Sequence, residues 1–174
     1  KEPSYTFTSI SVGNVRPAKR LDRMLEMFDN LRSRGIAFNH IHVGGGADLA
    51  QIKQLAAHKG HSDSITFLGP RSDVFQLLRN SDIFIHFSEY EGSPNVIMEA
   101  MASGLAVITT DCGDAKEYVI NQDNGFVIAP YNSVEFAQKY ELLKRDKELL
   151  NRMADRSLEI IKASSIQCLP QLFL

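Results

Sequence analysis

The chain has 174 residues, of which 44% are hydrophobic and 23% are charged, a composition typical of one soluble globular domain that needs no disulfide or structural metal. Its formal charge is −2 and its basic residues are scattered, which excludes the dense basic stripe of a nucleic-acid-binding domain, so nucleic acid is not an expected partner. The two cysteines share no motif spacing with each other or with the histidines, which argues against zinc and predicts a reducing, cytoplasmic location, and no apolar run in the sequence reaches the ~20 residues of a membrane span.

Strand and helix patterns alternate along the chain, starting with a β-branched and aromatic run over residues 5–13 that predicts a first strand. Pro17 then suits the first turn of an amphipathic helix, whose apolar residues recur at helical spacing up to Gly35. Further strands are predicted over 38–43, 64–68, 82–87, 105–110 and 125–128, with a helix ending near Gly60, helices over 73–79 and 94–103, and two more within 132–163.

This alternation predicts an α/β fold with a doubly wound parallel sheet, forming a single Rossmann-like domain over residues 1–163. Residues 164–174 lose helical periodicity and form a tail whose order the sequence does not decide. Ligands of such folds bind at the carboxyl ends of the strands, near the point where the strand order reverses. The loops that follow the strands are therefore the candidate binding sites.

The first of these loops begins at Gly13 and carries three cations, Arg16, Lys19 and Arg20, around the predicted helix start. Backbone N–H groups at a helix start and nearby cationic side chains both stabilise a bound phosphate. The loop therefore has the outline of an anion site, although solvated surface charges would give the same pattern.

The second loop contains three consecutive glycines, Gly44, Gly45 and Gly46. It does not match the G-x-G-x-x-G fingerprint, because the third small residue would fall at Leu49. The glycines are consistent with the close approach of a ligand or of another chain segment, or with a simple tight turn. The sequence leaves these interpretations open.

The loop after the fourth predicted strand leads to a pair of glutamates, with Glu91 in the loop and Glu99 inside the following helix. The two carboxylates can point into one cleft, where a buried Glu99 would accept hydrogen bonds from the two hydroxyls of a ribose and Glu91 would do the same for a sugar. Pairing of Glu99 with a neighbouring cation and solvation of Glu91 is the simpler alternative.

The segment between the glutamates has the pattern of a helix start. Ser93 can cap the helix, Pro94 suits its first turn, and the N–H groups of Asn95 and Val96 would face a diphosphate. His86, at the end of the fourth predicted strand, is the one histidine near this cleft, where a core or rim role is favoured over catalysis. The other four histidines lack metal-ligand spacing.

The stretch from Glu91 to Glu99 has the form E-x7-E, and with Gly92 and the run Glu-Ala-Met-Ala-Ser-Gly at 99–104 it resembles glycosyltransferase family 4. The likeness extends over roughly residues 9 to 160. Four further landmarks of that family stand in the family's order along the chain. Three precede Glu91, at 11–13 with Lys19, at 43–46 and at 67–69, and the fourth follows Glu99, at 124–126.

The resemblance implies the C-terminal half of a GT-B enzyme, a retaining hexosyltransferase that moves a sugar from a nucleoside-diphosphate sugar to an acceptor in surface polysaccharide or glycan synthesis. The chain would then lack an N-terminal acceptor domain and be inactive alone. Peripheral association with the inner face of a membrane would arise through that absent domain. No cofactor or metal is expected, because Lys19 and a helix terminus would supply the positive charge.

The same resemblance assigns roles to single residues. Lys19 and Glu91 are the catalytic candidates, with Lys19 balancing the diphosphate charge and Glu91 contacting the transferred sugar. Glu99 would hold the ribose, and the base would rest near residues 69–72. The donor-binding candidates are Gly13, Asn14, Arg16, Lys19, Gly44, Gly69, Arg71, Glu91, Gly92, Ser93, Pro94, Asn95, Val96 and Glu99.

One position departs from the family pattern, because Asn14 stands where an arginine usually follows the glycine of the first loop. Arg16, two residues on, is the candidate to replace that cation. Two alternative functions stay open. One is a nucleotide-sugar epimerase of GT-B architecture, which would use the same pocket to eliminate the diphosphate, and the other is a non-catalytic nucleotide-binding module, which the missing arginine would suit.

Overall fold

The computed structural model describes residues 6–88, 95–111 and 115–168. Within these residues, six strands pair in parallel to form one sheet. The strands are β1 (Thr8–Val12), β2 (Asn39–Val43), β3 (Ile65–Gly69), β4 (Ile83–His86), β5 (Ala106–Thr110) and β6 (Gly125–Ile128). Their order across the sheet is β3-β2-β1-β4-β5-β6, which is the doubly wound arrangement that the alternating pattern predicts.

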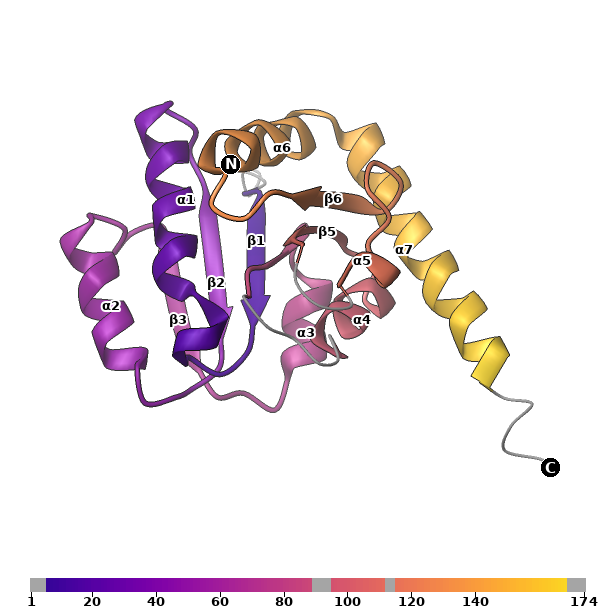
Figure 1. The fold of residues 1–174 in the computed structure, drawn as a ribbon, viewed down its shortest axis with the longest axis horizontal. Helices are drawn as coiled ribbons and strands as arrows, with labels where there is room; N and C mark the ends of the chain where they lie inside the picture. The colour runs from indigo at the N-terminus through magenta and orange to yellow at the C-terminus, as the bar shows by residue number, and fades with distance from the viewer. Residues whose placement is uncertain (1–5, 89–94, 112–114, 169–174) are drawn as a thin grey trace, which may run out of the picture.

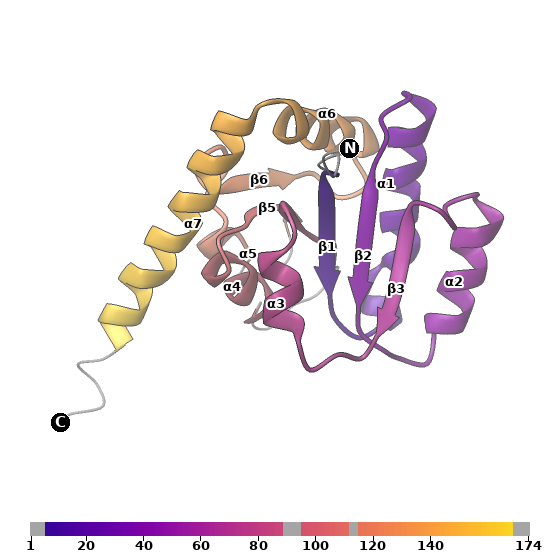
Figure 2. The same ribbon diagram turned by 180° about the vertical axis from the view of Figure 1, so that it is seen from behind.

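Helices cover both faces of the sheet (Figure 1). The helical segments are η1 (Pro17–Lys19), α1 (Leu21–Ser33), α2 (Leu49–His58), α3 (Val74–Arg79), α4 (Asn95–Ala102), α5 (Ala115–Tyr118), α6 (Ser133–Arg145) and α7 (Lys147–Cys168). Helix α1 lies in front of the strands in Figure 1 and behind them in Figure 2. It packs against α2 and α6, whereas α3 and α5 pack against α4. The predicted fold class is confirmed.

The core has two layers, one on each face of the sheet. All four residues of β4 and all five of β5 are buried, as expected for central parallel strands that helices cover on both faces. Neighbouring side chains of a strand enter opposite layers, so Ile83 packs in the layer of α1 and α6 while Phe84 packs in the layer of α4. This arrangement leaves the ends of the strands, rather than their faces, for ligands.

The helix predicted to begin at Pro17 is divided in two. Pro17 starts a short 3-10 turn that ends at Lys19, and α1 begins only at Leu21. Arg20 separates them in the left-handed conformation, with φ 46° and ψ 44°. Because a residue in this conformation cannot continue a right-handed helix, the turn after β1 projects from the axis of α1.

Helix α7 runs beyond the predicted end of the domain. It continues to Cys168, so residues 164–168 of the predicted tail are helical, while 169–174 lie outside the described residues. Its predicted apolar face packs on the body, where Met153 and Ser157 are fully buried. The later turns project away from the sheet in both views (Figure 1, Figure 2). Among the helices described, none has both the length and the apolar character that a membrane span requires.

Candidate functional site

The parallel strands all end at the same edge of the sheet, and the β1 and β2 arrows point toward the lower part of Figure 1. The strand order reverses between β1 and β4, because the chain crosses from β3 at one side of the sheet to β4 beside β1. At such a point the loops after the two strands separate and leave a crevice. Gly13, Lys19 and Phe87 line a hollow at this point, and we call residues 13–20, Phe87 and Ser88, with the start of α4, the switch-point site.

Two of the predicted site residues meet in the loop after β1. A Cβ atom built on Gly13 would lie 3.6 Å from Cε and 3.9 Å from Nζ of Lys19. The lysine side chain is half-buried and therefore folds back over the glycine at the carboxyl end of β1. An ammonium group is thus held where the backbone of the loop turns, which is a suitable position for a phosphate group.

The three glycines after β2 serve the first loop. A Cβ atom on Gly44 would overlap the carbonyl oxygen of Gly13, and one on Gly46 would overlap that of Val15. The Val15 N–H donates to the carbonyl of Gly45 at 2.6 Å. The interpretation of close approach by a chain segment is therefore the correct one for these contacts, because the missing side chains make room for the loop over residues 13–20.

Ser88, which follows β4, fastens the two loops together. Its hydroxyl donates to the carbonyl of Ala18 at 3.0 Å, and its own carbonyl accepts from the Thr110 hydroxyl at 3.4 Å. Ser88 is buried. This contact was not predicted from the sequence, although a polar residue directly after an apolar predicted strand was a usable signal.

The start of α4 forms the other side of the switch-point site. Asn95 is exposed and Val96 is half-buried at its first turn, where the helix dipole is positive. Glu99 is exposed, so the expectation of a buried carboxylate was wrong. The physical reason is the helical spacing, because Ile97, Ala100 and Met101 bury the face that meets the sheet and Glu99 lies away from it.

Four predicted residues of the loop before α4 are not placed. Glu91, Gly92, Ser93 and Pro94 lie outside the described residues. Their predicted roles in capping the helix and contacting a sugar remain predictions.

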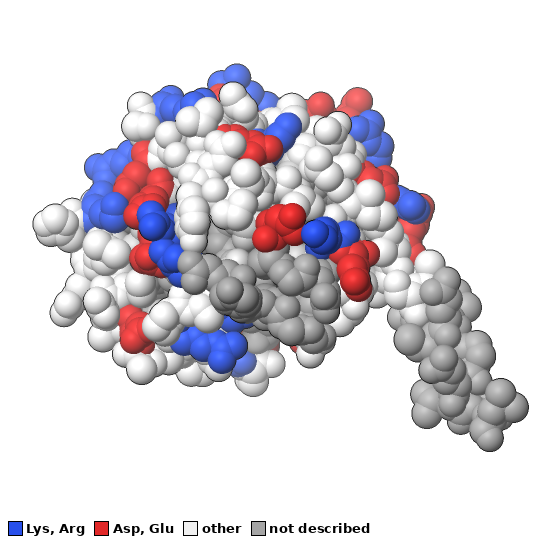
Figure 3. Space-filling model, in the orientation of Figure 1, with Lys and Arg blue, Asp and Glu red and all other residues white. Residues whose placement is uncertain are grey.

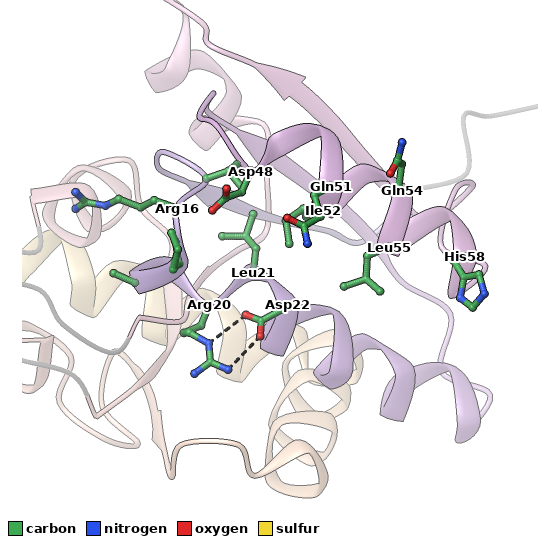
Figure 4. A pocket seen from close by; sticks show the side chains of 13 residues that line it. Arg16, Arg20, Leu21, Asp22, Asp48, Gln51, Ile52, Gln54, Leu55 and His58 are labelled. Atoms are coloured by element: carbon green, nitrogen blue, oxygen red, sulfur yellow. Dashed lines mark hydrogen bonds and ion pairs between the residues drawn. The ribbon is translucent and has the colours of Figure 1, made fainter.

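Arg16 and Lys19 line different hollows. Arg16 borders a groove of about 830 Å³ between η1 and α2, whereas Lys19 borders a hollow of about 20 Å³ above the end of β1. In Figure 4 the guanidinium of Arg16 points away from the α2 side chains, and Leu21, Ile52 and Leu55 give the groove an apolar floor. The larger groove therefore lies between η1 and α2, apart from the hollow that Lys19 and Gly13 line.

The remaining cation of the first loop has other partners. Arg20 forms two hydrogen bonds with the Asp22 carboxylate, at 3.1 and 3.0 Å (Figure 4). It donates a third to the Tyr131 hydroxyl. Asn14 is exposed. Arg20 therefore braces the start of α1.

The segment after β3 holds Gly69 and Arg71, both predicted to lie near the base. Gly69 has φ 71° and accepts a backbone hydrogen bond from Gly44 through its carbonyl. The Arg71 guanidinium grips the Asp73 carboxylate at 2.8 and 2.7 Å, and these hydrogen bonds lower the pKa of Asp73. Arg71 is therefore engaged by its neighbour, although its side chain stays exposed.

The charge distribution agrees with an anion site at this edge. Figure 3 shows Lys and Arg atoms gathered at the lower edge, next to the grey loop atoms, while the rest of that face mixes both signs. Within the described ranges, no group of three or more His, Cys, Asp or Glu side chains is arranged to hold a metal ion. The expected independence from a metal remains a prediction.

Comparison with known proteins identifies the family of the chain. A family model described as glycosyl transferases group 1 matches residues 1–159. An uncharacterized glycosyltransferase of Haemophilus influenzae is 32% identical over 151 residues, which cover 86% of this chain and 43% of that protein. The N-acetyl-alpha-D-glucosaminyl L-malate synthase of Bacillus anthracis is 29% identical over 152 residues, covering 87% of this chain and 40% of the synthase.

Among solved structures, that of Anabaena HepE in complex with UDP superposes with a TM-score of 0.82 at 25% identity, covering 91% of this chain and 44% of that one. The chain thus spans about two fifths of the length of the relatives it matches.

Proposed function

The chain belongs to the group 1 glycosyl transferases, and we propose that it forms the donor-binding domain of a retaining glycosyltransferase. In this proposal the switch-point site holds a nucleoside-diphosphate sugar. The acceptor is bound by a companion domain, since more than half the length of the curated relatives lies outside the matched region.

The observation that carries the proposal is the position of Lys19 over Gly13 at the end of β1. The loop around it is held from two sides, by the glycines after β2 and by the Ser88 hydrogen bond to Ala18. A cation on a fixed loop at a topological switch point is a built site for a diphosphate.

The first turn of α4 supports the same assignment from the other side of the crevice. Its positive dipole favours an anion, and Glu99 one turn later presents an accessible carboxylate. A carboxylate has two acceptor oxygens, which match the two hydroxyls of a ribose. The diphosphate and the ribose of one nucleotide would therefore find complementary groups in sequence order along α4.

The proposed reaction breaks the bond between the anomeric carbon of the sugar and the diphosphate oxygen. The acceptor hydroxyl oxygen forms the new bond to that carbon and loses its proton, and the sugar keeps its anomeric configuration. Negative charge develops on the departing diphosphate, where Lys19 and the α4 dipole stabilise it. Glu91 contacts the transferred sugar in this proposal.

Titration calorimetry of the chain with UDP, GDP and ADP tests the proposal, because the Anabaena relative holds UDP. We expect one of the three nucleotides to bind at one site per chain. Lys19→Met should weaken that binding about tenfold or more, since a hydrogen bond to a charged group is lost. Lys53→Met, on the exposed side of α2, is the matched control and should leave the affinity unchanged. Binding of none of the three would contradict the proposal.

A further inference from the structure

Four buried polar side chains form a continuous hydrogen-bonded row between β1 and β2. The Ser9 hydroxyl lies 2.9 Å from Nδ1 of His40, whose Nε2 lies 2.8 Å from the Ser11 hydroxyl. The Ser11 hydroxyl in turn lies 2.9 Å from Nδ1 of His42. The row follows the strand register, which pairs Ser9 with His40 and Ser11 with His42. It leads from the middle of the sheet to its carboxyl edge.

The direction of each hydrogen bond follows from counting protons. The Ser9 hydroxyl donates its one proton to the carbonyl of Asn39 at 3.0 Å, so it must accept from Nδ1 of His40. Burial holds the pKa of His40 well below its ordinary value, and the neutral ring then has a bare Nε2. The Ser11 hydroxyl donates to that nitrogen.

The last member of the row is fixed in the same way. Because the Ser11 hydroxyl donates its one proton to Nε2 of His40, its oxygen accepts a hydrogen bond from Nδ1 of His42. Burial lowers the pKa of His42 to about 4, and a hydrogen bond between the ring and the Gly13 backbone opposes this shift more weakly. The neutral His42 ring therefore carries its proton on Nδ1 and exposes a lone pair on Nε2.

That lone pair lies at the switch-point site. His42 is 1% exposed, and its Nε2 has no hydrogen-bond partner among the described residues. The ring borders the same hollow of about 20 Å³ as Gly13 and Lys19, which has room for about one water molecule. Buried polar atoms normally have a partner, so an unpartnered nitrogen on a ring that borders the same hollow as Lys19 indicates a function for the two residues together.

We infer that His42 is a positioning residue for the diphosphate: its Nε2 accepts a hydrogen bond from the Lys19 ammonium, directly or through one water, and so holds that cation over Gly13. The inference rests on the proposed function of the site. An imidazole suits this task because it is a neutral acceptor. A carboxylate in the same place would also orient the lysine, but it would cancel the positive charge that the diphosphate needs.

A double-mutant cycle with UDP as the calorimetric probe tests the inference, followed by GDP and ADP if UDP does not bind. His42→Phe removes the acceptor and should weaken binding about tenfold in the unmodified chain. In a chain that carries Lys19→Met the same change should have almost no effect, because His42 acts through the lysine. His42→Gln, which retains a side-chain acceptor, should recover part of the affinity.

His61→Phe is the matched control. His61 is also 1% exposed and donates to the Asp29 carboxylate through Nε2, but it lies before β3, at the opposite edge of the sheet. Its replacement should lower the melting temperature without changing nucleotide affinity. Equal weakening by His42→Phe in both lysine backgrounds would overturn the inference and leave the proposed function intact. Failure of the unmodified chain to bind any of the three nucleotides would instead overturn the proposed function.

A second measurement needs no substitution in His42 and serves if His42→Phe does not fold. Long-range ¹H–¹⁵N correlation spectra of the unmodified chain identify the tautomer of each histidine. We expect His42 with its proton on Nδ1 and an Nε2 resonance that shifts in Lys19→Met. A proton on Nε2 of His42, or a His42 Nε2 chemical shift that is the same in Lys19→Met as in the unmodified chain, would overturn the inference.

Discussion

The hydroxyl of Ser88 donates a hydrogen bond to the carbonyl of Ala18 across 70 positions of the sequence. Ser88 follows β4 and Ala18 lies in the turn after β1, so the bond closes the switch point between the two strands around which the fold reverses. The loop that carries Lys19 is thereby attached to the second half of the sheet.

Ser88→Ala should therefore affect both stability and binding. Loss of one buried hydrogen bond costs about 1 kcal/mol of unfolding free energy, and a looser turn should weaken nucleotide binding a few-fold. Urea denaturation and calorimetry measure the two effects. Ser33→Ala removes a similar bond, to the carbonyl of Asn30, at the exposed end of α1, and it should leave binding unchanged. An affinity equal to that of the unmodified chain in Ser88→Ala would refute the bracing role.

Gly44→Ala should be strongly destabilising, because a Cβ atom there would overlap the Gly13 carbonyl and φ is 143°. We expect a loss of more than about 2 kcal/mol in urea denaturation. Gly35→Ala is the control, since Gly35 has φ 70° with no heavy atom within 4 Å of the added methyl group, and it should cost only the left-handed strain of about 1 kcal/mol. Equal losses would show that Gly44 is needed for its backbone conformation alone.

Acid should destabilise the chain through His42. The folded pKa of about 4 lies below the ordinary value of 6.5, so between these pH values the unfolded chain takes up a proton that the folded chain refuses. The stability that His42 contributes is complete above pH ~6.5 and falls as the pH drops toward ~4. From pH 7 to pH 5 this amounts to about 2 kcal/mol.

Urea denaturation at both pH values measures this effect. In His42→Gln the loss between pH 7 and pH 5 should be smaller by about that amount, with His40 still contributing in the same direction. An identical loss in the variant and in the unmodified chain would mean that His42 titrates normally.

Arg16 should contribute less to binding than Lys19, because the two cations line different hollows. Arg16→Met should weaken nucleotide binding less than about threefold, by loss of general attraction that added salt also removes. Calorimetry at low and at high salt checks this. A loss as large as that of Lys19→Met, and insensitive to salt, would mean that Arg16 replaces the arginine missing at Asn14.

The sequence predicted the strands well where a strand is buried on both faces. Residues 83–86 form an apolar run that ends in a histidine, and they pair in the centre of the sheet. The break at Arg20 was not predictable, because an arginine adopts the left-handed conformation only when neighbouring structure imposes it. The helix starting at Pro17 was therefore predicted as one piece.

The site was harder to predict because its contacts join distant segments. Gly44 and Gly46 are needed because the backbones of Gly13 and Val15 approach them closely. Sequence spacing does not reveal that approach. The exposure of Glu99, in contrast, could have been predicted from the apolar spacing of Ile97, Ala100 and Met101.

The alternation Ser-x-Ser at 9–11 and His-x-His at 40–42 was visible in the sequence. Its meaning depended on the register that places the two patterns opposite each other. Polar residues at every second position of a buried strand should therefore be compared with the same pattern on a neighbouring strand, because the strand register can place the two patterns opposite each other.

A crystal structure of the chain with UDP would show whether the loop over Gly13 receives a diphosphate. We expect the diphosphate between the Lys19 ammonium and the first turn of α4, with the ribose hydroxyls on the Glu99 carboxylate. A diphosphate bound in the groove between η1 and α2 beside Arg16, with Lys19 and Glu99 untouched, would contradict this expectation.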